Sequence, residues 1–148
     1  MPDKRDLNLE KYSISKHRYR ELNNFCLQYY EYIKKRDELI EERQKLYEPY
    51  FGNEFKNTKV QDDKIVNITE ESALEAFKIS TRIEALNKKI QAIEMSVQEI
   101  AGDTFYEYLL KSITFGISYE RLYPKPPCNV KEFQAMRRLF YYMLDKKK

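Results

Sequence analysis

Residues 76–100 read AFKISTRIEALNKKIQAIEMSVQEI, and this stretch decides the fold. Its apolar residues recur in alternating steps of three and four, which places them along one stripe of an α-helix. A strict period of about 3.5 residues keeps such a stripe facing a partner helix under left-handed supercoiling. The charged residues between them, Glu94 included, are expected on the solvent side. The stripe consists of Ala76, Ile79, Ile83, Leu86, Ile90, Ile93, Val97 and Ile100.

A second helix is expected upstream to cover this stripe. Ser13 or Ser15 can cap its start, and Pro49 with Gly52 ends it near Tyr47. Its apolar residues also keep steps of three and four, which predicts one buried face. They are Tyr19, Leu22, Cys26, Tyr29, Ile33 and Ile40, and the stripe is widened by Phe25, Tyr32, Leu39 and Leu46.

Two arginines interrupt that apolar face. Arg36 and Arg43 fall on the seam, where their long stems can lie along apolar surface while the charged heads stay in water. We therefore expect an all-α fold with a long, coiled-coil-like helical hairpin over residues 13–101. The hairpin is expected to be antiparallel within one chain. Pairing between two chains, which makes a homodimer, is the alternative.

Residues 48–68 are expected to form an irregular insertion in this hairpin. Within them the stretch 59–66 fits a short β-hairpin with Asp62-Asp63 at its tip, and a flexible connection fits equally well. Asn67 and Glu70 then make a capping box for the heptad helix. The polar residues 1–12 are expected to be a flexible N-terminus.

Residues 102–148 predict a compact C-terminal unit. Gly102 can end the long helix in the left-handed conformation, and another helix follows over residues 104–115. Ser118 can cap a very short helix that runs through Tyr123. The three prolines within residues 124–127 forbid a helix beyond it.

The last helix is expected over residues 130–145. Asn129 with Glu132 makes a capping box at its start. The order of these elements, namely helix, short helix, turn and capped basic helix, is that of a three-helix, helix-turn-helix-like unit. The turn of six residues from Tyr123 to Cys128 is longer than the usual turn of about 3–4 residues. The face expected to be buried consists of Phe133, Met136, Phe140 and Met143.

The positive charge is concentrated at the C-terminal end. Residues 117–148 carry eight Lys or Arg against three Asp or Glu, whereas the whole chain has a net charge of +3. This asymmetry predicts an anionic partner there. The aromatic share of 14% is too high for a disordered chain. The sequence contains no run of about 18 apolar residues, so a membrane-spanning helix is not expected. No apolar signal segment opens the sequence, and Cys26 and Cys128 stand alone, so a cytoplasmic protein with reduced thiols is expected.

The outward face of the last helix carries short polar and basic side chains near its N-terminus, which a DNA major groove accepts. Arg can bind guanine, and Gln adenine, through two hydrogen bonds each. Neighbouring cations can neutralise phosphates, which positions a protein without reading sequence. A solvated basic helix is the alternative. The expected base contacts are Lys131, Gln134, Ala135 and Arg138, and the expected phosphate contacts are Arg121, Lys125, Arg137, Lys146, Lys147 and Lys148.

Parts of the sequence resemble small phage- and prophage-encoded proteins of Gram-positive bacteria. The residues that carry this resemblance are 12–22 (YSISKHRYREL), 25–29 (FCLQY), 109–119 (LLKSITFGISY) and 127–140. The layout is similar to transcriptional regulators of the RinA and ArpU type, whose C-terminal end is like the promoter-reading region of sigma factors. The resemblance implies that the last helix reads double-stranded DNA through Lys131, Gln134, Arg137 and Arg138.

Enzyme functions are not supported by the residue pattern. His17 is the one histidine and lies among cations on an expected surface, so a Ser-His or Cys-His pair has no other base. The three glycines are isolated, which excludes a glycine-rich phosphate loop, and two distant cysteines with one histidine make no zinc site. Asp62-Asp63 fits a turn tip better than a cation site. No enzyme, metal or cofactor is therefore expected.

The tyrosines indicate a second class of function. Tyrosine is favoured at protein interfaces because it offers a large contact area with a polar tip. The chain can then be a phage-derived interaction module that binds or inhibits a host protein, such as RNA polymerase or a defence nuclease. Filling the junction between hairpin and C-terminal unit is the alternative role. The tyrosines in question are Tyr29, Tyr30, Tyr32, Tyr141 and Tyr142.

Overall fold

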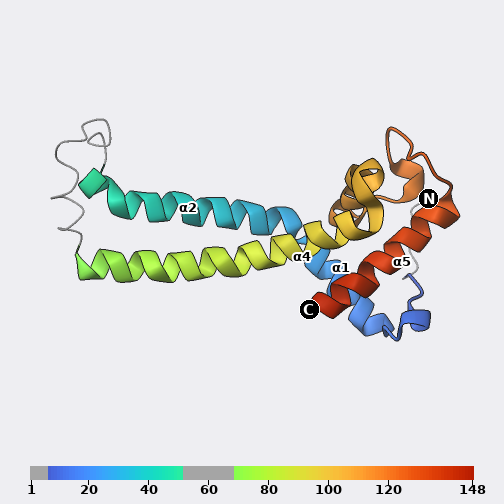
Figure 1. Ribbon diagram of the computed structural model, residues 1–148, viewed down its shortest axis with the longest axis horizontal. Coiled ribbons are helices and arrows are strands. Elements are labelled where there is room, and N and C mark those ends of the chain that lie inside the picture. Colours follow the sequence, from blue (N-terminus) through green and yellow to red (C-terminus); the bar gives the residue numbers. More distant parts are fainter. Residues whose placement is uncertain (1–6, 52–68) are drawn as a thin grey trace. The chain divides into compact units, whose positions relative to one another are not determined.

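The structure is a computed structural model that describes residues 7–51 and 69–148 (Figure 1). Every regular element in these residues is helical, so the all-α fold class is confirmed. The predictions for the 59–66 hairpin, for its Asp62-Asp63 tip and for Asn67 lie outside the described residues. The elements are η1 (Glu10–Tyr12), α1 (Lys16–Leu27), α2 (Tyr29–Phe51), α4 (Glu70–Phe115), η3 (Tyr119–Arg121) and α5 (Val130–Lys147).

The contacts divide the chain into two compact units. Unit 1 comprises Met1–Glu31 with Lys89–Lys148, and unit 2 comprises Tyr32–Lys88. The boundary therefore falls inside α2 and inside α4. The reason is that α1 packs with α5 in unit 1 instead of extending the two-helix pairing.

Unit 2 is built from the heptad stripe. Leu39 of α2 packs with Ile79 and Ile83 of α4, and all three are buried. Partly buried Ile40, Leu46 and Leu86 surround them. Figure 1 shows α2 beside the first part of α4 in this unit.

The two seam arginines of unit 2 each bond a polar residue across the helix pair. Arg36 Nη1 donates to Asn87 Oδ1 at 3.2 Å, and Arg43 Nη1 donates to Ser80 Oγ at 2.9 Å. A step of seven residues forward in α2 thus matches a step of seven back in α4, which is an antiparallel register. The arginine heads are held by partners on α4, whereas the sequence predicted heads in water.

Unit 1 has an aromatic core. The Tyr19 and Tyr141 rings meet edge to face at 5.0 Å between α1 and α5, and the Tyr141 hydroxyl donates to Asn23 Oδ1 at 3.3 Å. The stripe of α4 continues here through buried Ile90, Ile93 and Val97. Other buried side chains of this unit include Leu22, Phe25, Cys26, Tyr29, Leu109, Ile113, Leu122, Phe133, Phe140 and Leu144.

The N-terminal segment is more ordered than expected where the structure describes it. Leu9 and Ile14 are buried in unit 1, and the 3-10 helix η1 lies between them. Burial of these two apolar side chains offsets the entropy cost of ordering a polar segment. Ser15, as predicted, caps α1 by accepting a hydrogen bond from Arg18 N at 3.1 Å.

Three helix boundaries differ from the predictions. The expected first helix breaks at Gln28, whose φ of −90° and ψ of 5° end α1 before α2 begins. Helix α2 extends through Pro49 to Phe51, although a proline inside a helix removes one backbone hydrogen bond and its ring crowds the preceding turn. Helix α4 begins at Glu70, and Thr69 caps it by accepting a hydrogen bond from Ser72 N at 3.1 Å, while the expected cap Asn67 lies outside the described residues.

A glycine divides the long helix α4. Gly102 has φ 64° and ψ −174°, a conformation that is non-helical and open only to glycine at low cost. The predicted break at this residue is confirmed. The residues that follow it form the helix expected over 104–115, which the structure assigns to the same element α4.

Candidate nucleic-acid interface

The start of α5 is fixed by its capping box. Asn129 Oδ1 accepts from Glu132 N at 2.8 Å, and Glu132 Oε1 accepts from Asn129 N at 3.2 Å. The predicted capping box is therefore confirmed. Both side chains stabilise backbone donors that the helix itself leaves unpaired. The Glu132 carboxylate is thereby occupied at the helix end.

The buried face of α5 is rotated relative to the prediction. Met136 and Met143 are only half-buried, whereas Tyr141 and Leu144 are fully buried. The rotation follows from the side chain of Tyr141, whose ring packs on Tyr19. A fully buried hydroxyl also needs a hydrogen-bond partner, and this one reaches Asn23.

Three of the four expected base contacts, Lys131, Ala135 and Arg138, lie on the side of α5 opposite its buried face. Lys131 is exposed, and Gln134, Ala135 and Arg138 are half-buried. Their spacing of three, four and seven residues places Lys131, Ala135 and Arg138 along one helical row. This row carries the cation Lys131 at the start of the helix, the small residue Ala135 in the middle of the row and the cation Arg138 at the other end of the row.

Arg137 is turned inward and away from the row. Its Nη1 donates to Gln134 Oε1 at 2.8 Å, and its Nε is buried without a hydrogen-bond partner among the described residues. Burial raises the pKa of Tyr141 well above its ordinary value, and the nearby Arg137 guanidinium opposes this rise. Gln134 Oε1 is therefore occupied by Arg137 in this structure.

The three C-terminal lysines each contact another residue of unit 1. Lys147 Nζ lies 3.3 Å from both carboxylate oxygens of Glu99. Lys146 Nζ lies 4.3 Å above the centre of the Tyr142 ring, and Lys148 Nζ lies 3.9 Å above that of Phe25. These cations interact with acidic and aromatic groups of their own chain, and a phosphate would compete with those partners.

The turn before α5 carries exposed cations. Arg121 and Lys125 are both exposed, and Lys125 Nζ donates to the Glu120 carbonyl oxygen at 3.1 Å. The middle helix expected from Ser118 to Tyr123 is a single 3-10 turn, η3, and Ser118 gives it no side-chain cap. We call the segment from Arg121 to Lys131, with its exposed cations Arg121, Lys125 and Lys131, the basic turn.

A second exposed surface in unit 1 is apolar. The Tyr30 and Phe115 rings stack with centroids 4.7 Å apart, and they are 44% and 56% exposed. Leu27, also exposed, lies next to Gly116, the residue that follows Phe115, since a Cβ on Gly116 would be 3.5 Å from Leu27 Cδ2. We call Leu27, Tyr30 and Phe115 the apolar patch.

Carboxylates lie close to the apolar patch. The Tyr29 hydroxyl donates to Glu94 Oε2, so Glu94 is bonded where the sequence predicted a solvated residue. Burial, with the charges of Glu94 and Glu107, raises the pKa of Tyr106. Of the tyrosines expected at an interface, Tyr29, Tyr32 and Tyr141 are buried core residues instead.

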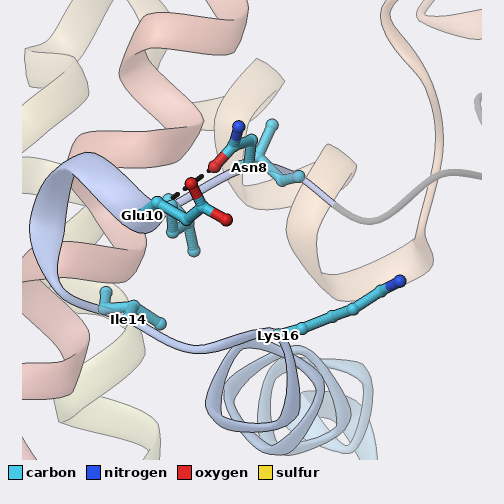
Figure 2. A pocket seen from close by; sticks show the side chains of 6 residues that line it. Asn8, Glu10, Ile14 and Lys16 are labelled. Atoms are coloured by element: carbon cyan, nitrogen blue, oxygen red, sulfur yellow. Dashed lines mark hydrogen bonds between the residues drawn. The ribbon is translucent and has the colours of Figure 1, made fainter.

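A small hollow lies in the N-terminal segment of unit 1. It has a volume of about 170 Å³ and is lined by residues 7–10, Ile14 and Lys16. Figure 2 shows Asn8 and Glu10, joined by a hydrogen bond of 3.0 Å from Glu10 N to Asn8 Oδ1, on one side of it and Ile14 and Lys16 on the other. This mixture of neighbouring residues does not indicate one class of ligand.

The remaining reactive groups do not assemble into a chemical site. Burial raises the pKa of the Cys26 thiol far above its ordinary value, so the thiol stays protonated. His17 is exposed on α1. In residues 7–51 and 69–148, no three His, Cys, Asp or Glu side chains are grouped as metal ligands would be. No helix in those residues combines the length and hydropathy needed to cross a membrane.

Comparison of the chain with protein-family models, with curated proteins and with solved structures found no match.

Three exposed residues of the candidate surfaces were not predicted from the sequence. They are Tyr123 in the basic turn, and Phe115 with Leu27 in the apolar patch. Tyr123 is 86% exposed. Its position between Arg121 and Lys125, directly before a proline, was a signal in the sequence.

Proposed function

We propose that the chain is a phage-type DNA-binding transcriptional regulator that reads duplex DNA with the outward row of α5. The observation that carries the proposal is an excess of exposed positive charge. Of the three acidic residues in 117–148, Glu132 accepts a hydrogen bond in the capping box, Asp145 pairs with Arg18, whose Nε lies 2.6 Å from Oδ1, and Glu120 is exposed next to Arg121. Arg121, Lys125 and Lys131 are exposed as well.

The row on α5 suits a major groove in size as well as charge. Lys131 at the helix start and Arg138 two turns later can reach base edges or phosphates, while Ala135 lets the helix backbone come close. Gln134 reads adenine in this proposal only after Arg137 releases its Oε1. Because η3 is a single turn, docking rests on α5 and the basic turn instead of a full middle helix.

Fluorescence anisotropy with duplexes from the control regions of the chain's own genome tests the proposal. Arg138→Ala should weaken binding to the preferred duplex about fivefold to 150-fold, as loss of a base contact does. Lys88→Ala, an exposed lysine of unit 2, is the matched control and should leave affinity unchanged. Weak binding that ignores sequence and is equal in both variants would contradict the proposal.

A protein-binding function is the second candidate, and the apolar patch favours it. Two exposed aromatic rings in contact, with a third exposed apolar side chain nearby, are a feature of interaction surfaces, where aromatic rings are enriched. The proposed partner is a host protein, either RNA polymerase or a defence nuclease. Phe115→Asp should abolish binding to the purified partner, and the exposed Leu139→Ala should not.

A homodimer through the hairpin would have to use residues other than the heptad stripe. In unit 2 the stripe is already buried against Leu39 of the same chain. Leu74 and Phe77 of α4 are exposed instead, at 56% and 68%. If this pair forms the dimer contact, Phe77→Asp converts a dimer to a monomer in analytical ultracentrifugation, whereas Leu139→Ala leaves it a dimer.

A further inference from the structure

Tyr123 has the most exposed large apolar side chain in the described part of the chain. It is 86% exposed, and it makes no ring contact and no hydrogen bond with another described residue. A single exposed tyrosine is ordinary on a loose loop. The basic turn, however, is held on both sides of Tyr123.

Buried anchors and hydrogen bonds hold this turn. Leu122, directly before Tyr123, is 2% exposed, and Pro126 is buried three residues after it. The Tyr119 hydroxyl donates to the Cys128 carbonyl oxygen at 2.6 Å, which closes the turn across its base. The ring of Tyr123 is therefore presented outward by an ordered backbone, at a low entropy cost for binding.

Two exposed cations, Arg121 and Lys125, lie two residues to either side of Tyr123 in the sequence. Lys125 Nζ lies 5.1 Å from the centre of the Tyr119 ring. An aromatic face between cations is the combination that binds single-stranded nucleic acid: the ring stacks on a base, and the cations neutralise the phosphates next to that base. A protein pocket that received this ring would instead have to desolvate both cations.

We propose that Tyr123 stacks on an unpaired nucleobase, so that the ligand is duplex DNA with an unpaired base next to the segment that α5 contacts. This inference rests on the proposed function and specifies its ligand. An unpaired base is required because the bases inside a duplex are already stacked on both faces. A bulged, flipped or overhanging base offers a free face to a ring at the protein surface.

The test compares two DNA ligands with the full chain. One is the preferred duplex, and the other is the same duplex with a single unpaired 2-aminopurine. The wild type should bind the second ligand about fivefold to 150-fold more tightly, the range measured for one base stacked on one aromatic residue. It should also quench the 2-aminopurine fluorescence, because stacking quenches this base.

Variants of Tyr123 separate this inference from the proposed function. Tyr123→Ala should lose the preference and the quenching but still bind the paired duplex, whereas Tyr123→Phe should retain both. Tyr30→Ala, which truncates an exposed tyrosine of the apolar patch, is the matched control and should behave as the wild type.

Two results would overturn the inference, and they differ. If the wild type binds both ligands equally, shows no quenching and still depends on Arg138, the stacking role of Tyr123 is wrong and the proposed function stands. If the wild type binds neither ligand, both are wrong.

Discussion

The two units are both helical, yet they bury different side chains by different means. Unit 2 packs aliphatic residues from two helices in a regular register, with Arg36 and Arg43 bonded across the seam. Unit 1 packs tyrosine and phenylalanine from segments far apart in the sequence, such as Tyr19 on Tyr141. Regular repetition gives unit 2 one kind of surface along its length. Irregular packing gives unit 1 an ordered turn, exposed cations and an exposed aromatic ring, which is where a ligand site can be built.

The largest expected effect is in the core of unit 1. Phe133→Ala removes a fully buried ring and should lower the free energy of unfolding by about 3–5 kcal/mol, through lost transfer energy and a cavity. Denaturant unfolding measures this, and hydrogen exchange should locate the loss of protection in α1 and α5. Leu139→Ala on the same helix is the exposed control. A loss under about 1 kcal/mol would mean that Phe133 is not a core residue.

The corresponding change in unit 2 is Leu39→Ala. Leu39 is 1% exposed against Ile79 and Ile83, so the expected loss is about 2–5 kcal/mol. Hydrogen exchange should increase first in residues 32–47 and 70–88, while Leu74→Ala, at an exposed position, changes little. If the protection patterns of Leu39→Ala and Phe133→Ala were identical, the division into two units would be contradicted.

Alkaline pH should destabilise unit 1. Burial raises the pKa of Tyr29, Tyr141 and Cys26 above their ordinary values, with Glu94 adding to the rise at Tyr29. The unfolded chain then loses these protons first, so the stability present below about pH 9 falls as pH rises, by up to about 1.4 kcal/mol per pH unit for each group. Denaturant unfolding at a series of pH values measures this fall, and Tyr29→Phe should make it shallower. Stability that rises with pH would contradict the assignment.

A smaller effect is expected at the break in α4. Gly102→Ala places a Cβ where nothing lies within 4 Å, so the penalty comes from the φ of +64° alone. We expect a loss of about 1 kcal/mol or slightly more in thermal or denaturant unfolding. Gln91→Ala, at an exposed helical position of α4, should be neutral. A stabilised Gly102→Ala would show that α4 can run straight through this residue.

Local signals in the sequence predicted unit 2 better than unit 1. The alternation of three and four from Ala76 to Val97 predicted the buried stripe, because helical geometry alone fixes which residues share a face. The caps at Ser15 and Asn129 were predictable for the same reason, since each depends on residues three positions apart. The break at Gln28 was not predictable, because no proline or glycine is there and α1 ends where it packs with α5.

The candidate site was predictable in composition but not in geometry. The basic excess identified Arg121, Lys125 and Lys131, which are exposed. Spacing did not predict that Arg137 turns inward to Gln134, because that contact depends on the burial of Tyr141 behind it. Nor did it predict that Lys147 pairs with Glu99, which is far away in the sequence.

The salt dependence of binding to the preferred duplex tests the central claim most directly. The four cations Arg121, Lys125, Lys131 and Arg138 are each expected to neutralise one phosphate charge. A plot of the logarithm of the association constant against the logarithm of the salt concentration should then have a slope of about −3 to −4. Lys131→Ala should make that slope shallower by about 0.9, and Lys88→Ala should leave it unchanged. A slope near zero, or one that Lys131→Ala does not change, would contradict a nucleic-acid interface on α5 and the basic turn.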